Sequence, residues 1–175
     1  MLKSLQAWLG LKEDAPAPEP APLRELLDAL DKLDPERAQY LARFAFLLGR
    51  VARVDEHVSD EEARAMEIML TEQAHLPGSQ AMLVVQLART SKQMFSATTD
   101  FTVTQEFADA AGYDERLALA HCLFAVAGSD ERISTAEEAE LYRIANQLRI
   151  TGPDLQKIRL QYRPMLPGLN PDRPE

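Results

Sequence analysis

The sequence has 175 residues, of which 19 are basic and 28 acidic, giving a formal net charge of −9. This length allows one domain with a sizeable core. The acidic balance excludes nonspecific nucleic-acid binding, which needs a basic surface to neutralise phosphates.

Two further absences narrow the class of protein. The single cysteine, Cys122, excludes an intramolecular disulfide, and its apolar surroundings predict a small buried core residue. No apolar run approaches the roughly 20 residues that a transmembrane helix needs, and residues 1–15 lack the long apolar region of a signal peptide. We therefore expect a cytoplasmic protein without a transmembrane segment.

Residues 1–11 have the pattern of a short amphipathic helix that is too short to be stable alone. The residues on its apolar side are Leu2, Leu5, Trp8 and Leu9. The segment either docks on the domain, on a partner or peripherally on a membrane surface, or stays a loosely held terminus. Residues 12–22 alternate proline with alanine and glutamate, which predicts an extended, semi-rigid linker.

Residues 23–163 form the expected domain, because apolar residues recur there with helical period. The breaks in this period delimit helices at residues 23–33, 35–54, 60–74, 80–95, 101–111, 114–127, 135–148 and 153–162. Abundant Ala and Leu, with little Gly, also favour an all-α protein. Residues 164–175, which contain four prolines, predict an irregular tail.

One stretch occurs twice at a fixed offset of 75 residues, as LGRVARVDEHVSDEE at 48–62 and LFAVAGSDERISTAE at 123–137. Seven aligned pairs are identical, and each copy reads Val-Ala-x-x-Asp-Glu-x-[Val/Ile]-Ser-x-x-Glu. The helix breaks keep the same offset, so the repeat unit spans three helices. We expect a compact bundle of about seven helices built from two pseudo-twofold-related units, plus the short N-terminal helix; two copies are too few for a solenoid.

The end of each copy has the spacing of a capping box, Ser59-x-x-Glu62 and Ser134-x-x-Glu137. In such a box the Ser hydroxyl accepts from the N3 amide and the N3 Glu accepts from the N-cap amide. A glutamate near a helix N-terminus also complements the helix dipole. Helix geometry alone therefore accounts for the Ser and the Glu.

Helix geometry does not account for Asp55 and Asp130, which lie four residues before the N-cap at the end of the preceding helix. A carboxylate there meets the negative end of the helix dipole. A turn amide, a nearby arginine such as Arg50, or a cation would offset it. Adjacent acids, Glu56 and Glu131, add charge. Two interpretations stay open: turn and capping chemistry alone, or a divalent cation held by carboxylate oxygens.

The other chemistry-bearing residues give weaker signals. The spacing does not match an EF-hand loop. His121 lies nine residues before Asp130, which is over about 10 Å along a helix, so it is either a core histidine or a ligand in a site completed by another helix. No nucleophile elbow, phosphate loop, paired-cysteine or HExxH motif is present, and we expect no enzymatic activity.

The repeated Val-Ala-x-x-Asp-x-x-[Val/Ile]-Ser-x-x-Glu resembles the TerB-like (tellurite-resistance protein B) family, and best its uncharacterised subgroup with two copies of such an element. The resemblance covers residues 23–163. It implies an all-α fold of about seven helices with pseudo-twofold symmetry. It also implies a metal site at four residues of this chain: Asp55, Glu62, Asp130 and Glu137.

This chain departs from the family pattern after each aspartate, where the family has Gly and this chain has Glu56 and Glu131. Because Gly supplies a left-handed turn conformation, the turn geometry is expected to differ. The extra carboxylate either strengthens cation binding or only changes solvation. Many members carry Glu near the position of His121, which makes that residue a weaker candidate ligand.

Together these observations predict a non-enzymatic TerB-like binding module in a stress or tellurite-resistance-related role, with a divalent metal ion of unknown identity at its acidic turns. We expect an unknown protein partner and no nucleic acid. The alternative is a purely structural protein–protein interaction domain with no metal site. The most remote alternative is a metal-dependent hydrolase, for which no nucleophile or base was found.

Overall fold

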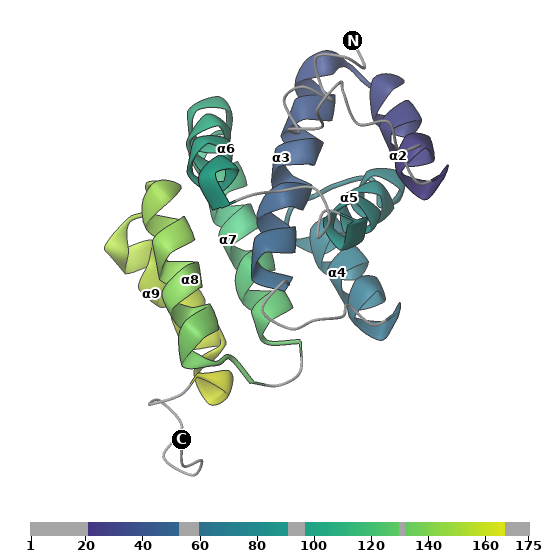
Figure 1. The fold of residues 1–175 in the computed structure, drawn as a ribbon. Helices are drawn as coiled ribbons and strands as arrows, with labels where there is room; N and C mark the ends of the chain where they lie inside the picture. Colours follow the sequence, from purple (N-terminus) through teal and green to yellow (C-terminus); the bar gives the residue numbers. More distant parts are fainter. Residues whose placement is uncertain (1–20, 53–59, 91–96, 130–131, 167–175) are drawn as a thin grey trace.

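The computed structural model describes residues 21–52, 60–90, 97–129 and 132–166, and every regular element in these ranges is helical. The helices are α2 (Ala21–Asp31), α3 (Pro35–Ala52), α4 (Asp60–Glu72), α5 (Gly78–Thr90), α6 (Ala97–Ala110), α7 (Tyr113–Ala127), α8 (Thr135–Gln147) and α9 (Gly152–Gln161). The prediction of an all-α bundle is confirmed (Figure 1). None of the described helices combines the length and apolar character needed to cross a bilayer.

The long helix α3 is the centre of the bundle and packs against α2, α5, α6, α7 and α8. Its start follows from the Asp-Pro pair: Pro35 opens the helix, and Asp34 Oδ1 accepts a hydrogen bond from the Glu36 amide at 3.0 Å. One stripe of α3, with residues three or four positions apart, is buried in the core. Its members are Leu41, Phe44, Leu48 and Val51.

Aromatic rings of α6 pack against those of this central helix. Phe107 of α6 lies 5.9 Å, centroid to centroid, from Phe44 and 5.4 Å from Tyr40, both on α3. Rings at such separations add to the stabilisation that their buried area provides. This cluster therefore fixes α6 beside α3.

A second buried helix, α7, corresponds to α3 in the repeat and packs against α3, α4, α8 and α9. The contacts between the units are reciprocal, because α4 packs on α7 and α8 packs on α3. Such reciprocity is what two related units would produce; the twofold relation itself stays a prediction. Figure 1 shows that α3 and α7, the helices leading into the two acidic turns, both finish at the lower end of the molecule as drawn.

The chain after α9 also packs on the second unit. Residues Arg163–Met165, mostly assigned from the sequence to the irregular tail, form a 3₁₀ turn, and Leu166 is buried. The Met165 carbonyl accepts a hydrogen bond from the Ile133 amide at 2.9 Å. A Cβ at Gly128 would stand 2.7 Å from Met165 Sδ, so the glycine allows this segment to approach the end of α7 closely.

Candidate functional site

The structure describes only part of the predicted acidic site. Outside the described residues lie Asp55, Glu56, Asp130 and Glu131, together with the side chain of Glu62. The two predicted site residues that it does place are Glu137 and His121. The metal site at the four carboxylates therefore stays a prediction, and the geometry around the second turn shows what its glutamate does.

The capping box predicted at the second turn is present at the start of α8. Ser134 Oγ accepts from the Glu137 amide at 3.2 Å, and Glu137 Oε2 accepts from the Ser134 amide at 2.7 Å. The Ser134 hydroxyl also donates to Glu137 Oε2, at 2.7 Å. Before the cap, Ile133 is fully buried. Sequence spacing alone was enough to find this box, because all of its partners lie within one turn.

The Glu137 carboxylate is buried, with 5% of the residue exposed, and its two oxygens are used unequally. Oε2 takes both hydrogen bonds from Ser134, whereas Oε1 accepts none from the described residues. The charge lies at the N-terminus of α8, where the helix dipole stabilises it. One carboxylate oxygen is therefore held by the cap while the other keeps its lone pairs for another donor or a cation.

A buried ion pair ties the end of α3 to α8. Arg50, in the last turn of α3, is 7% exposed and donates to Glu140 Oε1 at 2.5 Å and to Thr104 Oγ1 at 3.0 Å. Arg143 forms a further ion pair with Glu140. The bonds from Arg50 connect its guanidinium to α6 and α8, and the prediction that Arg50 offsets Asp55 stays a prediction, because Asp55 lies outside the described residues. Arg50 lies beside the first acidic turn in sequence, so this pair joins the region of one turn to the helix that leaves the other.

His121 is half-buried on α7. Burial lowers its pKa, which favours the neutral imidazole at pH 7. Its backbone carbonyl accepts a hydrogen bond from the Tyr162 hydroxyl at 3.3 Å. Across the described ranges, no group of three or more His, Cys, Asp or Glu side chains is arranged to hold a metal. A ligand role for His121 thus depends on residues beyond these ranges.

Cys122 is a buried core residue, as predicted, with 1% exposed. Burial raises the pKa of its thiol to about 12. The thiolate, which is the nucleophilic and metal-binding form, is therefore scarce at neutral pH.

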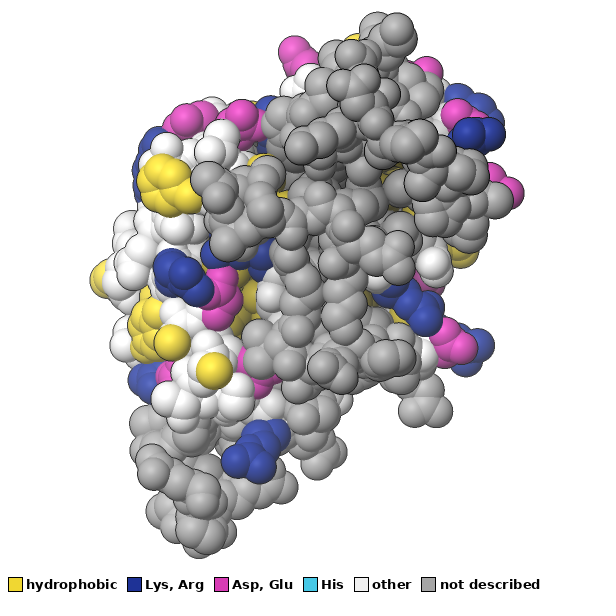
Figure 2. All heavy atoms as spheres, viewed as in Figure 1, with side chains coloured by type: hydrophobic (Ala, Val, Ile, Leu, Met, Phe, Trp, Pro, Cys, Tyr) yellow, Lys and Arg dark blue, Asp and Glu magenta, His cyan; other side chains and the backbone are white. Residues whose placement is uncertain are grey.

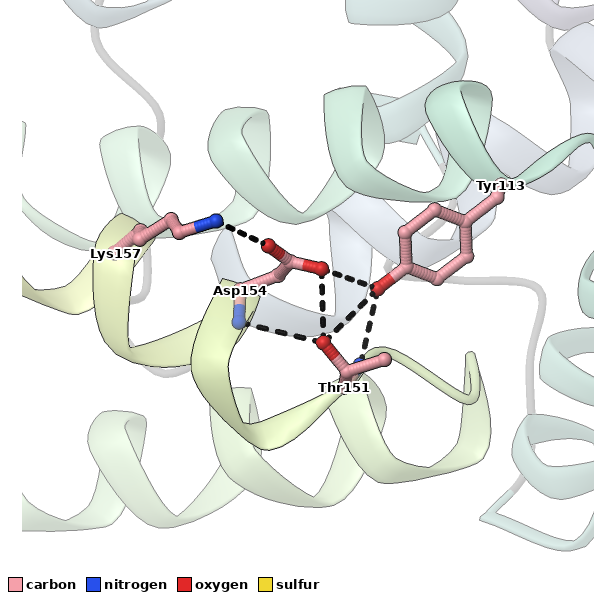
Figure 3. A network of polar contacts seen from close by, with 4 residues as sticks. All are labelled: Tyr113, Thr151, Asp154 and Lys157. Carbon is pink, nitrogen blue, oxygen red and sulfur yellow. Dashed lines mark hydrogen bonds and ion pairs between the residues drawn. The ribbon is translucent and has the colours of Figure 1, made fainter.

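A second polar network, missed from the sequence, joins the starts of α7 and α9 (Figure 3). The Tyr113 hydroxyl donates to Asp154 Oδ2 at 2.8 Å and accepts from the Thr151 amide at 3.1 Å. Lys157 and the Thr151 hydroxyl also donate to Asp154, at 2.9 and 2.8 Å. Hydrogen bonds from Lys157, Thr151 and Tyr113 lower the pKa of Asp154 to about 2. The local signal was Thr-x-x-Asp; the tyrosine lies too far away in sequence to be linked to it.

The charged side chains on the visible face are mixed in sign. Figure 2 shows basic and acidic side chains side by side over the described part of this face. Ion pairs also link the described helices: Arg159 lies 2.7 Å from Glu138, and Arg43 lies 3.2 Å from Glu106. Such pairs cancel charges of opposite sign and leave the formal net charge of −9 unchanged.

Comparison with protein families gives one match for this chain. The family described as tellurite resistance protein TerB matches residues 41–160, a range that includes both copies of the repeated turn. The comparisons with curated proteins and with solved structures gave no match. The match covers more than half of the chain and coincides with helices from within α3 to α9.

Proposed function

Because the chain belongs to the TerB family of tellurite resistance proteins, we propose that it is a non-enzymatic binding module that holds a divalent cation at its acidic turns. The proposed ligands are the carboxylates of Asp55, Glu62, Asp130 and Glu137. The proposed setting is a stress or tellurite-resistance response.

The observation that carries this proposal is the repeated aspartate after each of the two central helices. Asp55 and Asp130 follow the C-terminal ends of α3 and α7, where the helix dipole disfavours a carboxylate. Both helices finish at the same end of the bundle (Figure 1). A cation there would offset the charge of both aspartates at once.

The capping boxes supply the second part of the argument. Hard divalent cations bind carboxylate and carbonyl oxygens. Glu137 is oriented by its two hydrogen bonds from Ser134, which leave Oε1 without a bond to a described residue. A ligand oriented in this way loses little further freedom when it binds an ion. The same arrangement is proposed for Glu62, by the identity of the two motifs.

The test is calorimetric titration with Ca²⁺, Mg²⁺, Mn²⁺ and Zn²⁺ of the wild type and of the double variant Asp55→Asn/Asp130→Asn. The aspartates are the right targets because a change at Glu137 would also break the capping box. Asp114→Asn is the matched control, since Asp114 is exposed in the first turn of α7, at the opposite end from Asp130.

We expect at least one of the four ions to bind, and to bind the wild type and Asp114→Asn with the same affinity. The double variant should bind about tenfold or more weakly, since carboxylate number sets the affinity of such sites. A wild type that binds none of the four ions would end the metal proposal.

The alternative is a purely structural interaction domain. Its support is a set of large apolar side chains left exposed on the described helices: Ile68, Met82, Phe101 and Leu160. On this alternative, Asp55→Asn/Asp130→Asn would leave partner binding unchanged, whereas a charged residue at one of the exposed apolar positions would abolish it.

A further inference from the structure

The hairpin of α4 and α5 exposes two large apolar side chains on one face. Ile68 on α4 is 58% exposed and Met82 on α5 is 54% exposed. The two helices pack on each other, and the Asp60–Arg89 ion pair, 3.2 Å long, joins the start of α4 to the end of α5. The helices therefore run antiparallel.

Helical period places Ile68 and Met82 on the sides of α4 and α5 that face away from the buried residues of each helix. Ile68 is eight residues after Asp60, and Met82 is seven residues before Arg89. Seven residues make about two turns of an α-helix, so Met82 lies on the same side of α5 as Arg89, whereas eight residues leave Ile68 about 80° round α4 from Asp60. Because the two intervals rise about 10–12 Å along their helices, Ile68 and Met82 lie at matching heights in the antiparallel hairpin. Ile68 and Met82 form one exposed apolar pair, hereafter the hairpin face.

The α4–α5 hairpin carries a net negative charge, which comes entirely from α4, because α5 contains one basic residue, Arg89, and no acidic residue. The α4 sequence, DEEARAMEIMLTE, contains five acidic residues and one basic residue. Residues 1–12, MLKSLQAWLGLK, contain two lysines and no acidic residue. They also carry the apolar side predicted above: Leu2, Leu5, Trp8 and Leu9. The N-terminal segment thus matches the hairpin face in both charge and apolar character.

The linker has the reach for this contact. Helix α2 begins at Ala21 and packs on α5, so the chain enters the fold beside the hairpin. Residues 12–20, in an extended polyproline conformation of about 3.1 Å per residue, span about 28 Å. The 13 residues of α5 extend only about 20 Å at about 1.5 Å each. The segment can therefore reach any point along α5.

We propose that residues 1–11 dock as an amphipathic helix on the hairpin face of the same chain, with Trp8 and its apolar neighbours over Ile68 and Met82. Lys3 and Lys12 then lie near the carboxylates of α4. A net charge of −9 opposes the approach of the chain to an anionic membrane, which favours the intramolecular site. This interaction does not depend on cation binding at the turns.

Trp8 provides the readout, because it is the only tryptophan in the chain. Its fluorescence is measured in the full-length protein and compared with the urea-unfolded chain. We expect a blue-shifted maximum and reduced quenching by acrylamide in the wild type. The double variant Ile68→Glu/Met82→Glu should return both values close to those of the unfolded chain.

Phe101→Glu is the matched control, because Phe101 is equally exposed, at 53%, but lies on α6. It should leave the Trp8 signal unchanged. Far-UV circular dichroism verifies that each variant is folded, as expected for exposed positions.

Four results would overturn the proposal. The first is a solvent-exposed Trp8 in the wild type. The second is a burial of Trp8 that survives the double variant or is lost in Phe101→Glu. The third is a shift that depends on protein concentration, which would identify a second copy as the occupant. The fourth is a shift that appears only with anionic phospholipid vesicles.

Discussion

Helices α8 and α9 begin with the same local device and fit into the fold differently. Each opens with a hydroxyl residue followed three positions later by an acid, Ser134 with Glu137 and Thr151 with Asp154. In both, the hydroxyl accepts from the N3 amide and donates to the carboxylate. Glu137 is buried, however, whereas 27% of the Asp154 side chain is exposed.

The two acids also close their caps through different partners. Glu137 is long enough to accept directly from the Ser134 amide at 2.7 Å and closes its box alone. At α9 the Thr151 amide donates to Tyr113 instead, and the tyrosine hydroxyl bridges to Asp154. Since an acid at this position has a capping role in both helices, the motif glutamate is weak evidence for a metal. The aspartates before the cap carry the functional argument.

The largest expected effect breaks the buried ion pair that further anchors α8. Glu140→Ala would remove the Glu140 carboxylate from the buried Arg50, and we expect a loss of about 3 kcal/mol in the free energy of unfolding. Urea denaturation measures it. Arg143→Ala, which removes a partner that is 65% exposed, should cost less than about 1 kcal/mol. Equal losses of stability in the two variants would contradict the expectation that the buried ion pair contributes more than the exposed one.

This ion pair also marks where sequence reasoning stops. The periodic apolar pattern predicted the helices, and the Ser134 box followed from spacing within one turn. Arg50 and Glu140 are 90 residues apart, and Tyr113 and Asp154 are 41 apart. Local spacing shows which residues share a helix face but not which helix lies opposite. Both networks therefore required the tertiary structure.

Two helices also begin earlier than the sequence predicted. The sequence placed the start of one helix at residue 114, whereas α7 begins at Tyr113 with Gly112 as its N-cap. The Glu115 side chain accepts from the Gly112 amide at 2.8 Å, which favours the earlier start. Helix α6 begins at Ala97, before the predicted residue 101. For the candidate site, the capping role of Glu137 was predictable, and the roles of Asp55 and Asp130 stay predictions.

The next effect tests the box at α8 directly. Glu137→Ala removes the acceptor of both the Ser134 amide and its hydroxyl, and we expect a loss of about 1–2 kcal/mol. Glu115→Ala is the comparison, because Glu115 is exposed and its N-cap partner is a glycine without a hydroxyl. Its loss should be about half as large. Denaturant midpoints would refute the ranking if Glu115→Ala proved the more harmful change.

A smaller effect is expected from removing the bridge at α9. Tyr113→Phe deletes the hydroxyl between Thr151 and Asp154 but keeps the ring that lies under Arg116. We expect a loss of about 1 kcal/mol, the typical net contribution of a hydrogen bond. Tyr142→Phe is the control, because the Tyr142 hydroxyl makes no hydrogen bond within the described ranges while its ring lies beside Arg159. Indistinguishable thermal midpoints for the two variants would show that the bridge does not stabilise α9.

The last prediction separates the two helix starts by pH. In the folded protein Asp154 has a pKa of about 2, below its ordinary value of 3.8, because Lys157, Thr151 and Tyr113 donate to the carboxylate. A depressed folded-state pKa contributes stability above the unfolded-state value, and this contribution is lost as the pH falls through the folded-state value. Asp154→Asn should therefore be less stable than wild type at pH 7, and the two urea midpoints should converge between about pH 4 and pH 2.

Asp114→Asn provides the control for that convergence, because Asp114 is exposed and makes no hydrogen bond through its carboxylate to a described residue. Its midpoint should follow the wild type throughout the range. If the difference in urea midpoint between wild type and Asp154→Asn stays constant down to pH 2, protonation of Asp154 does not account for the difference. If Asp154→Asn lowers the urea midpoint at pH 7 by less in a protein that also carries Tyr113→Phe, part of the stabilisation comes through the tyrosine. The bridged geometry of α9 requires this result, whereas the self-contained box of α8 has no such bridge.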